Sequence, residues 1–517
     1  MPIYQAGSLN QTALTAPDLY VGIVPPKTRY INGIATDVLG IVGIADWGPV
    51  NSAVLIGSAS DLAQKIGTPS VRKYDLCTAI SVSIQVGAAN IRAVRVTDGT
   101  DTAATATLKD TAVAIGVTLT AYYTGITGNQ LSATLSAGTA ASSWKLVVSL
   151  PGLTPEVFDN ITGTGLALWQ NIVSAVNNGQ SGIRGASQLV IATVGASVVA
   201  PATTQTVAFT TGTSGNTTIT DSVLVGVDGV VGTGRKGMYA LRSSNAQVAN
   251  LVDVTDATQW PTMATYGLQE GCYMVTQGPA GASYSTVSAS LTTAGVDNYC
   301  MKVMVGDWDY WADQLNAQNR MLAPATFAAA KLASSNPSLS ILNKQISNIV
   351  STQRNLTNQA YSSAEIGAIN TARLDVITNP CPGGAYFGGR SGLNTSSNSA
   401  TNGDNYTRMT NYLALTIAAN FGSVVGKLQT VDQRREAKNT MSSWLQGLKD
   451  AGMIGDVNGG AAFSVQLDSG NNSDAQVALG YETADVQVKY LSVIRFFLVN
   501  LEGGQSVSVT VSNTPRA

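Results

Sequence analysis

The sequence predicts a multidomain chain that combines α/β and α+β architecture. Its 517 residues exceed what one ordinary hydrophobic core accommodates, and size scaling gives roughly two to four domains. Helix-like and strand-like segments alternate on both sides of residues 99–222, whereas that stretch is rich in Thr, Ser, Gly and Val and almost uncharged. We therefore expect an α/β middle domain interrupted by an inserted β-rich domain, then a C-terminal α+β domain completed by extended arms.

The expected segments follow one another along the chain. They are an N-terminal arm (1–25), a discontinuous α/β middle domain (26–98 and 223–379), the inserted β-rich domain (99–222), the C-terminal α+β domain (380–502) and a C-terminal arm strand (503–517). Only 12% of the residues are charged, against roughly a quarter in a typical soluble chain. Such a composition is common in β-rich proteins whose surfaces are largely covered by neighbours.

The middle domain is predicted from apolar runs of strand length that alternate with helical periodicity. The run Val38–Ala45 fits a buried strand and is far shorter than the roughly 20 apolar residues that cross a bilayer, so membrane insertion is not expected. The other strand-like segments are 54–56, 91–96, 223–227, 272–276 and 299–305. The helical segments are 60–66, 79–86, 237–252, 324–332 and 365–370.

Two amphipathic helices, 406–421 and 432–451, define the C-terminal domain. Their apolar stripes indicate ordinary core packing and consist of Met409, Leu413, Ile417, Phe421, Met441, Trp444, Leu445 and Leu448. The opposite face of the second helix carries the basic residues Arg434, Arg435, Lys438 and Lys449. Such a face is usually solvated, and it can also meet an acidic partner. In the insertion, the alternating run 145–149 predicts a strand, and 167–177 predicts a helix.

Both ends of the chain are predicted to be extended arms. At the N-terminal end, prolines frame a short extended piece that includes Leu19, Tyr20, Val21 and Ile23. At the other end a Gly503-Gly504 hinge precedes a strand in which Val507, Val509 and Val511 alternate with Ser and Thr. Such a strand can complete its own sheet or augment the sheet of another subunit. The presence of two arms favours exchange between subunits.

The residue types argue against familiar enzyme chemistry. The chain contains no histidine, which removes Ser-His and Cys-His nucleophile pairs and His-bearing zinc sites. Its four cysteines, Cys77, Cys272, Cys300 and Cys381, are scattered and are expected to be buried free thiols. The net charge of −2 without a basic cluster argues against direct nucleic-acid binding. We expect no catalytic residue, no metal and no cofactor. Residues 1–12 have neither the basic nor the apolar region of an export signal, so we expect folding in the cytoplasm.

Two local patterns point to alternatives that we consider less favourable. Gly232–Gly237 reads G-x-G-x-x-G after a strand-like segment, which would suit a dinucleotide-binding enzyme, with Asp253 and Asp256 about twenty positions on. The spacing is too long for the tight first turn of that motif, and a flexible junction between domains explains it better. Asp307 and Asp309 form a carboxylate pair, which we interpret as an ordinary solvated turn.

Several segments, in order, resemble the tail sheath family of contractile phages. Residues 16–25 (APDLYVGIVP) are similar to the family's Pro-Gly-Val-Tyr arm, with Asp18 at the usual glycine. Residues 42–51 (VGIADWGPVN), with 54–56 and 60–67, look like its strand, Gly-Pro turn, strand and helix. Residues 128–132 (GNQLS) resemble a Trp-Gly-Asn-x-Leu-Ser element, and 379–391 resemble the loop before the C-terminal domain. The order and spacing of the motifs carry this resemblance.

The resemblance implies a structural subunit of a viral tail rather than an enzyme. Copies of the chain would form hexameric rings stacked in a helix around a tail tube, with baseplate and tail terminator proteins at the ends. The inserted domain would face outward, the arms would augment a neighbour's sheet, and the basic helix face would lie towards the tube. Contraction would drive the tube through a cell envelope for genome delivery, without nucleotide, on energy stored in subunit packing. The sheath of a phage-like bacteriocin or secretion system is the related alternative.

Overall fold

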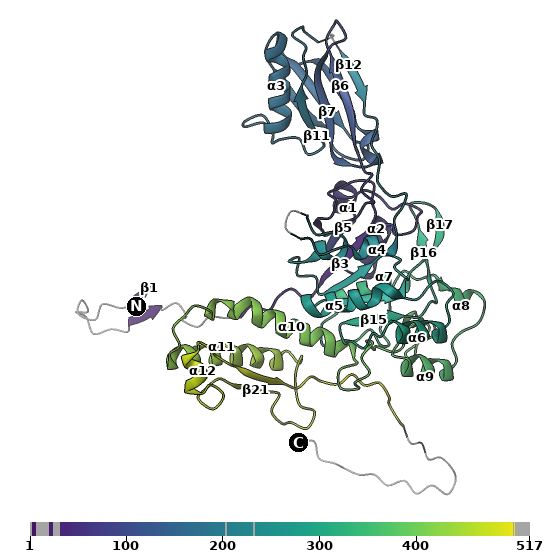
Figure 1. Ribbon diagram of the computed structural model, residues 1–517, viewed down its shortest axis with the longest axis vertical. Helices are drawn as coiled ribbons and strands as arrows, with labels where there is room; N and C mark the ends of the chain where they lie inside the picture. The colour runs from purple at the N-terminus through teal and green to yellow at the C-terminus, as the bar shows by residue number, and fades with distance from the viewer. Residues whose placement is uncertain are drawn as a thin grey trace.

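The computed structural model describes residues 3–6, 20–23, 31–201, 204–230, 233–499 and 501. Most of these residues belong to three bodies, which Figure 1 shows along the long axis of the molecule. We call them the insert (103–208), the middle body (38–98 and 219–403) and the C-terminal body (404–490). The chain is a mixed α/β multidomain protein with several separate sheets, as the sequence predicts.

The middle body is built on a six-stranded sheet in the order β15-β14-β13-β3-β5-β4. All neighbouring strands are parallel except β4, which runs antiparallel to β5. The strands are β3 (Val38–Gly43), β4 (Ala53–Ile56), β5 (Asn90–Arg95), β13 (Val248–Leu251), β14 (Tyr273–Gln277) and β15 (Met301–Met304). The central strand β3 is buried along its whole length, as a parallel sheet covered on both faces requires.

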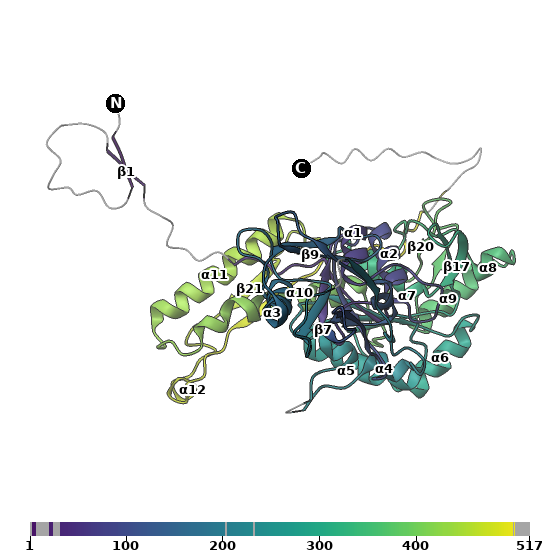
Figure 2. The same ribbon diagram turned by 90° about the horizontal axis from the view of Figure 1, so that it is seen from above.

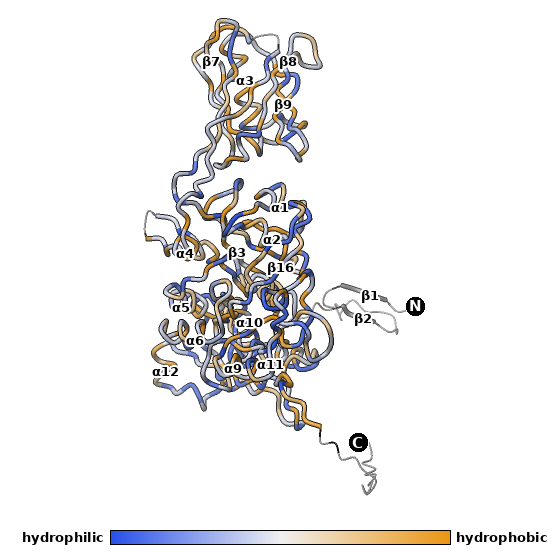
Figure 3. Tube along the Cα trace, turned by 90° about the vertical axis from the view of Figure 1, so that its right-hand side faces the viewer, coloured by the Kyte–Doolittle hydropathy of each residue, from blue (hydrophilic) through white to orange (hydrophobic). Residues whose placement is uncertain are grey.

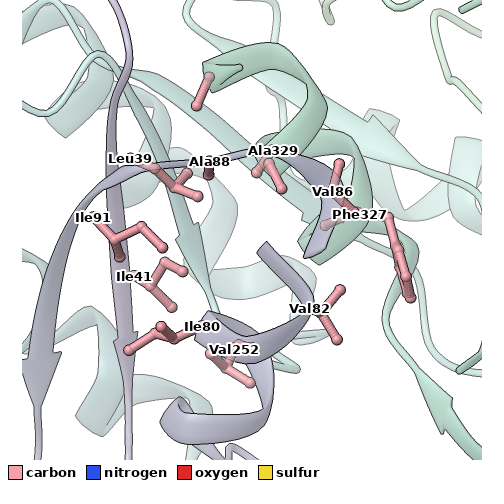
Figure 4. Packing of buried hydrophobic residues seen from close by; sticks show 14 of the residues in the cluster. Leu39, Ile41, Ile80, Val82, Val86, Ala88, Ile91, Val252, Phe327 and Ala329 are labelled. Atoms are coloured by element: carbon pink, nitrogen blue, oxygen red, sulfur yellow. The ribbon is translucent and has the colours of Figure 1, made fainter. Parts of the chain in front are cut away.

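Helices cover both faces of this sheet. On one face Leu39 and Ile41 pack with α2 (Leu76–Val86) and α7 (Pro324–Ala333), an arrangement that Figure 4 shows from close by. On the other face Val38 and Val42 pack with α5 (Trp260–Glu270) and α6 (Tyr284–Thr293). The alternation of side chains along β3 therefore supplies two hydrophobic layers from a single strand.

The remaining elements of the middle body surround the sheet. They are α1 (Ala59–Lys65), α4 (Asp221–Val225), η3 (Gly237–Leu241), η4 (Ala257–Gln259), β16 (Asp309–Asp313), β17 (Gln318–Leu322), β18 (Ser351–Thr352), α8 (Gln353–Leu356), α9 (Ser363–Thr371), β19 (Ile377–Thr378) and β20 (Gly388–Gly389). Strands β17, β16 and β18 form their own small sheet in that order.

Two of the expected elements are wrong. The strand expected at 223–227 is the short helix α4, and the helix expected at 237–252 is the 3₁₀ turn η3 followed by β13. The four residues of β13 are all buried between β3 and β14. Short apolar runs suit a buried helix or a buried strand equally, and tertiary packing decides between them. Helices α5 and α6 were not expected.

The insert contains two sheets and one helix. Its strands are β6 (Ala103–Lys109), β7 (Ile115–Thr124), β8 (Ser132–Ala137), β9 (Trp144–Ser149), β10 (Glu156–Ile161), β11 (Val190–Val194) and β12 (Gln205–Ala208), with η2 (Ile126–Gln130) between β7 and β8. The sheets have the orders β10-β9-β8-β12 and β11-β7-β6. The Thr105–Thr210 bridge connects the edge strand β6 of one sheet with the residues that follow the edge strand β12 of the other. Helix α3 (Gly165–Asn178) buries Trp169 and Ile172 against them, which confirms the predicted helix.

The C-terminal body consists of two long helices and a two-stranded sheet. Helix α10 (Asp404–Phe421) and helix α11 (Val431–Asp450) are joined by η5 (Gly422–Val424). Strands β21 (Phe463–Gln466) and β22 (Asp485–Val488) are antiparallel, with α12 (Asp474–Ala478) between them in the chain. Six of the eight predicted stripe residues lie in or against one hydrophobic cluster, which confirms their interpretation as core packing. Met441 is buried outside this cluster, and Phe421 is half-buried at the end of α10.

A buried ion cluster joins the middle body to the C-terminal body. The Nζ atom of Lys302 on β15 lies 2.6 Å from Asp375 Oδ2 and 2.9 Å from Oδ1 of Asp404, the first residue of α10. Asp404 also accepts hydrogen bonds from Tyr273 Oη and Ser340 Oγ. Burial disfavours the charge of Lys302, but the two carboxylates outweigh it and raise the pKa of the ammonium.

Candidate assembly interface

The C-terminal sheet contains only two strands among the described residues, β21 and β22. Phe463, Val465, Val486 and Val488 pack from one face of this sheet against α10 and α11. These four side chains are only partly buried, whereas strands β3, β13, β14 and β15 of the middle body are buried at every residue. A two-stranded sheet has two outer edges with unpaired backbone groups, and such edges readily accept further strands.

An exposed apolar run follows β22. Residues 494–499 lead away from the body, and Figure 3 shows this run as hydrophobic up to the last described residues. Its large apolar side chains are between 70% and 92% exposed: Ile494, Phe496, Phe497, Leu498, Val499 and Leu501. Isolated exposed apolar residues are ordinary, but a contiguous run of this kind marks an interaction site. We call residues 494–501 the terminal run.

A groove of about 660 Å³ lies beside the start of this segment. Helix α10 contributes Tyr406, Thr410, Leu413 and Ile417 to it, and the opposite wall is formed by β22 and residues 489–493. The wall is held in place because Asn405 Nδ2 donates to the Leu491 carbonyl and Tyr490 bridges to Ile454. The groove therefore combines an apolar helix face with extended backbone, which suits an extended peptide segment.

The N-terminal arm contains two described strands. β1 (Ile3–Ala6) pairs in parallel with β2 (Tyr20–Ile23), and Figures 1 and 2 both show β1 well away from the three bodies. The predicted arm residues Tyr20, Val21 and Ile23 lie in β2. An isolated pair of strands is only marginally stable in water.

Some of the predicted arm residues fall outside the described part of the chain. These are Leu19, the hinge glycines Gly503 and Gly504, and the strand residues Val507, Val509 and Val511. The terminal run directly precedes the hinge. Its sequence signal is the continuous apolar stretch 496–499, and a run this short does not distinguish a buried strand from an exposed segment.

The predicted basic face of α11 is largely neutralised by acidic residues of the same chain. Arg435 pairs with Asp432, Lys438 pairs with Asp468, and Arg434 lies 4.0 Å from Glu482. Lys449 is exposed near the end of α11. The face therefore has alternating charges rather than a uniform positive potential.

The carboxylate pair Asp307 and Asp309 is not a solvated turn, and that interpretation is wrong. Both side chains are buried beside the small sheet β17-β16-β18. Asp307 accepts hydrogen bonds from Thr352 Oγ1 and the Arg354 backbone, whereas neither carboxyl oxygen of Asp309 has a partner among the described residues. Burial raises the pKa of Asp309 well above its usual range, and the nearby Asp307 adds to this effect. A pair closed off from solvent cannot reach a dissolved substrate.

The structural context required of a dinucleotide site is also absent around the glycine motif. The described residues on either side form the helix α4 and the 3₁₀ turn η3, not a strand and a long helix. Gly232 itself lies outside the described residues, and Arg235 pairs with Asp228 on the surface. A first βα turn that cradles a pyrophosphate is therefore not formed here.

The usual ligand position of an open α/β sheet is filled by side chains. Ligands bind such sheets beyond the carboxyl ends of the strands where the strand order reverses, here between β3 and β13. The cavity at this place measures only about 10 Å³ and is lined by charged residues that include Asp75, Asp253 and Arg320. Burial raises the pKa of Asp253 to about 6. The space suits at most a single water molecule.

All four cysteines are free and buried, as expected. Within the described residues, no group of three or more acidic, cysteine or histidine side chains is arranged to hold a metal ion. A search of the same residues for helices both long and apolar enough to cross a membrane found none.

Solved sheath proteins share this architecture. The sheath tail protein of Listeria innocua aligns with a TM-score of 0.59 at 14% identity, over 88% of this chain and 94% of that chain. The sheath tail protein of Desulfitobacterium hafniense gives a TM-score of 0.55 at 15% identity, over 87% and 93%. The sheath of an extracellular contractile injection system, the PVC sheath complex in its contracted state, gives 0.55 at 10% identity, over 96% and 99%.

A scan against protein-family models and a search of curated proteins each found no match. The structural matches extend over nearly the whole of this chain and of the matched chains, so they concern the complete arrangement rather than one common domain. The resemblance noted from the sequence is thereby confirmed for the fold: this chain has the fold of contractile tail sheath proteins.

Proposed function

We propose that this chain is the structural subunit of a contractile tail sheath. Copies of it would assemble as stacked hexameric rings around a tail tube, and contraction would drive the tube through a host cell envelope to deliver a genome. The observation that carries the proposal is the unfinished C-terminal sheet, with its open edges, adjacent groove and exposed terminal run. These features stay unfavourable in water until another copy covers them.

In this proposal the arms of one subunit complete the C-terminal sheet of another. Residues Leu19, Tyr20, Val21 and Ile23 would pair at one edge, and Val507, Val509 and Val511 at the other, with Gly503 and Gly504 as the hinge. The division of the chain into segments that end at residues 25, 98, 222, 379, 502 and 517 is part of the same proposal. Each segment would occupy its own position in the sheath. The insert would face outward, and baseplate and terminator proteins would bind the two ends of the sheath.

The test is polymerisation of the purified protein, observed by negative-stain electron microscopy. The full chain should form rings or tubes, and replacing Val507, Val509 and Val511 by Ser should abolish them without unfolding the monomer. The chain provides a matched control, because replacing Ser506, Ser508 and Ser512 by Ala changes the other face of the same strand. Tubes formed equally well by both variants would contradict arm exchange, and a full chain that stays monomeric at high concentration would contradict the sheath assignment.

The basic face of α11 supplies a narrower part of the proposal. We propose that Arg434, Arg435, Lys438 and Lys449 lie towards the tube, where the internal acidic partners of the first three compete with acidic groups of the tube protein. Binding of the sheath to the tube should then weaken as salt rises, because exposed charges are screened. Salt-independent co-sedimentation with the tube would exclude this contact.

Matched structures belong both to sheath tail proteins and to an extracellular contractile injection system. A headless injection particle is therefore the second candidate context for the same subunit. Electron micrographs of particles that contain this chain distinguish the two, since a genome-delivering tail carries a capsid and an injection system does not.

A further inference from the structure

The insert joins the middle body through two adjacent chain segments. Residues 97–102 enter it and residues 209–218 leave it, and we call these two segments the neck. They are hydrogen-bonded to each other through the Thr102–Thr213 bridge and through Asp98, which accepts from the Thr218 backbone. Two extended segments such as these would by themselves form a flexible connection, because a two-stranded ribbon has little stiffness of its own.

Arg95 fastens this neck to the middle body. It is the last residue of β5, and its side chain is completely buried. Nη1 donates to the Gly48 carbonyl at 2.8 Å and to the Thr124 carbonyl at 2.6 Å, and Nη2 donates to the Ser214 carbonyl at 3.3 Å. The first acceptor belongs to the middle body, the second ends β7 of the insert, and the third lies in the returning neck segment. One guanidinium group thus holds three separate chain segments.

Asp46 provides a second fastening beside the first. Its carboxylate accepts from Ser214 Oγ at 2.7 Å and from Arg72 Nη1 at 2.8 Å, and Arg72 in turn binds Asp75 at the N-terminus of α2. This series of contacts connects the neck with a helix that packs on the central sheet. Because Asp46 and Arg95 both reach Ser214, bending the neck would break contacts at both.

Trp47 fills the base of the insert from the middle body. Its ring is 2% exposed and belongs to the hydrophobic cluster of the insert rather than to those of the middle body. It contacts Tyr123 edge-on with ring centroids 5.3 Å apart. Beside this contact a cleft of about 850 Å³ opens between α1 and insert residues such as Leu153 and Gln188. This cleft leaves room for the insert to tilt towards α1, and the contacts of Arg95 and Asp46 at the neck oppose that tilt.

We infer that Asp46, Trp47 and Arg95 lock the insert to the middle body, so that the two move as one rigid unit. This inference goes beyond the proposed function and does not depend on it, because the contacts lie within one chain. If the chain works as a sheath, any rotation of the middle body on contraction carries the insert through the same rotation. Arg95 and Asp46 are then positioning residues for the outer surface of the particle.

The test measures the distance between two spin labels in the free monomer. Ala63→Cys on α1 and Ala196→Cys at the far end of the insert are both exposed, and the four native cysteines are buried, so labelling is selective. A rigid neck gives a narrow distance distribution. Arg95→Gln should broaden it, because a neutral amide cannot serve three carbonyls in different directions.

A matched control and a second variant accompany this measurement. Arg92→Gln removes an arginine from the same strand whose side chain donates to the Ser244 carbonyl of the middle body, and it should leave the distribution narrow. Gly125→Ala should broaden it even if Arg95→Gln fails to fold, because a Cβ there would overlap the Asp46 carbonyl oxygen and the backbone has φ of 131°. A broad distribution in the unmodified chain, or equal widths in Gly125→Ala and Arg92→Gln, would overturn the inference.

Discussion

The six-stranded sheet of the middle body and the two-stranded sheet of the C-terminal body differ in how much of their surface the rest of the chain covers. Helices cover both faces of the larger sheet, and a parallel bridge from Asp375 to Met304 covers its β15 edge. The smaller sheet has helices on one face and ends in an exposed apolar run. The comparison shows which sheet is covered by its own chain and which sheet is left with open edges and exposed apolar residues beside it.

The amino-acid composition of the individual strands explains this difference in coverage. β3 has no polar side chain and is buried along its whole length, whereas β21 and β22 alternate apolar and polar residues. Alternation is the pattern of a sheet with one covered face and one open face. The middle body therefore has the more complete core, and the C-terminal body is the part to which the proposed function assigns assembly.

The sharpest way to break this comparison is to truncate one phenylalanine in each region. Phe327 on α7 is fully buried, and Phe327→Ala should lower the free energy of unfolding by about 3–5 kcal/mol, because it leaves a cavity in the core. Phe497→Ala should change the stability of the monomer by less than about 0.5 kcal/mol but weaken polymerisation, because Phe497 is 82% exposed. Urea unfolding of the monomer and electron microscopy measure the two effects. Equal destabilisation by both would mean that the terminal run belongs to the subunit's own core.

A second substitution tests the junction between the two regions. Lys302→Met leaves Asp375 and Asp404 buried without their cation, which should cost about 3 kcal/mol or more. Hydrogen exchange should rise in the first turn of α10, because Asp404 begins that helix. Lys449→Met, at an exposed position of α11, is the matched control and should have little effect. A Lys302→Met protein as stable as this control would show that the cluster does not join the bodies energetically.

The parts of the fold that the sequence predicted share one property, a long or strongly periodic signal. Strand β3 and helices α2, α10 and α11 show such a signal, and their apolar residues lie mainly in the core. Strand β13 lacks it, since its four residues include Asn250 and only neighbouring strands give them a sheet environment. Local residue patterns therefore predict elements well but not their tertiary partners.

The candidate interface was predicted in kind but not in detail. Extended arms follow from prolines, glycines and alternating valines, which are local signals. The groove on α10 and the exposure of residues 494–501 depend on what the rest of the chain leaves uncovered, which no local pattern records. The neck shows the same limit, because Arg95 and Ser214 are 119 residues apart in the chain. The burial of Asp309 was not predicted either, because an acidic residue is normally expected at the surface.

Asp309 provides a pH-dependent test of how completely the middle body is closed to solvent. Its pKa is raised by burial, so the folded chain holds a proton that the unfolded chain releases once the pH exceeds the ordinary aspartate value. Stability should therefore fall as pH rises from about 4 towards the raised pKa, at up to roughly 1.4 kcal/mol per pH unit. Asp309→Asn cannot ionise and should remove this part of the slope in urea titrations across pH. Asp432→Asn, on the exposed start of α11, is the control, and an unchanged slope in Asp309→Asn would mean that Asp309 is ionised in the folded chain and has a counter-charge.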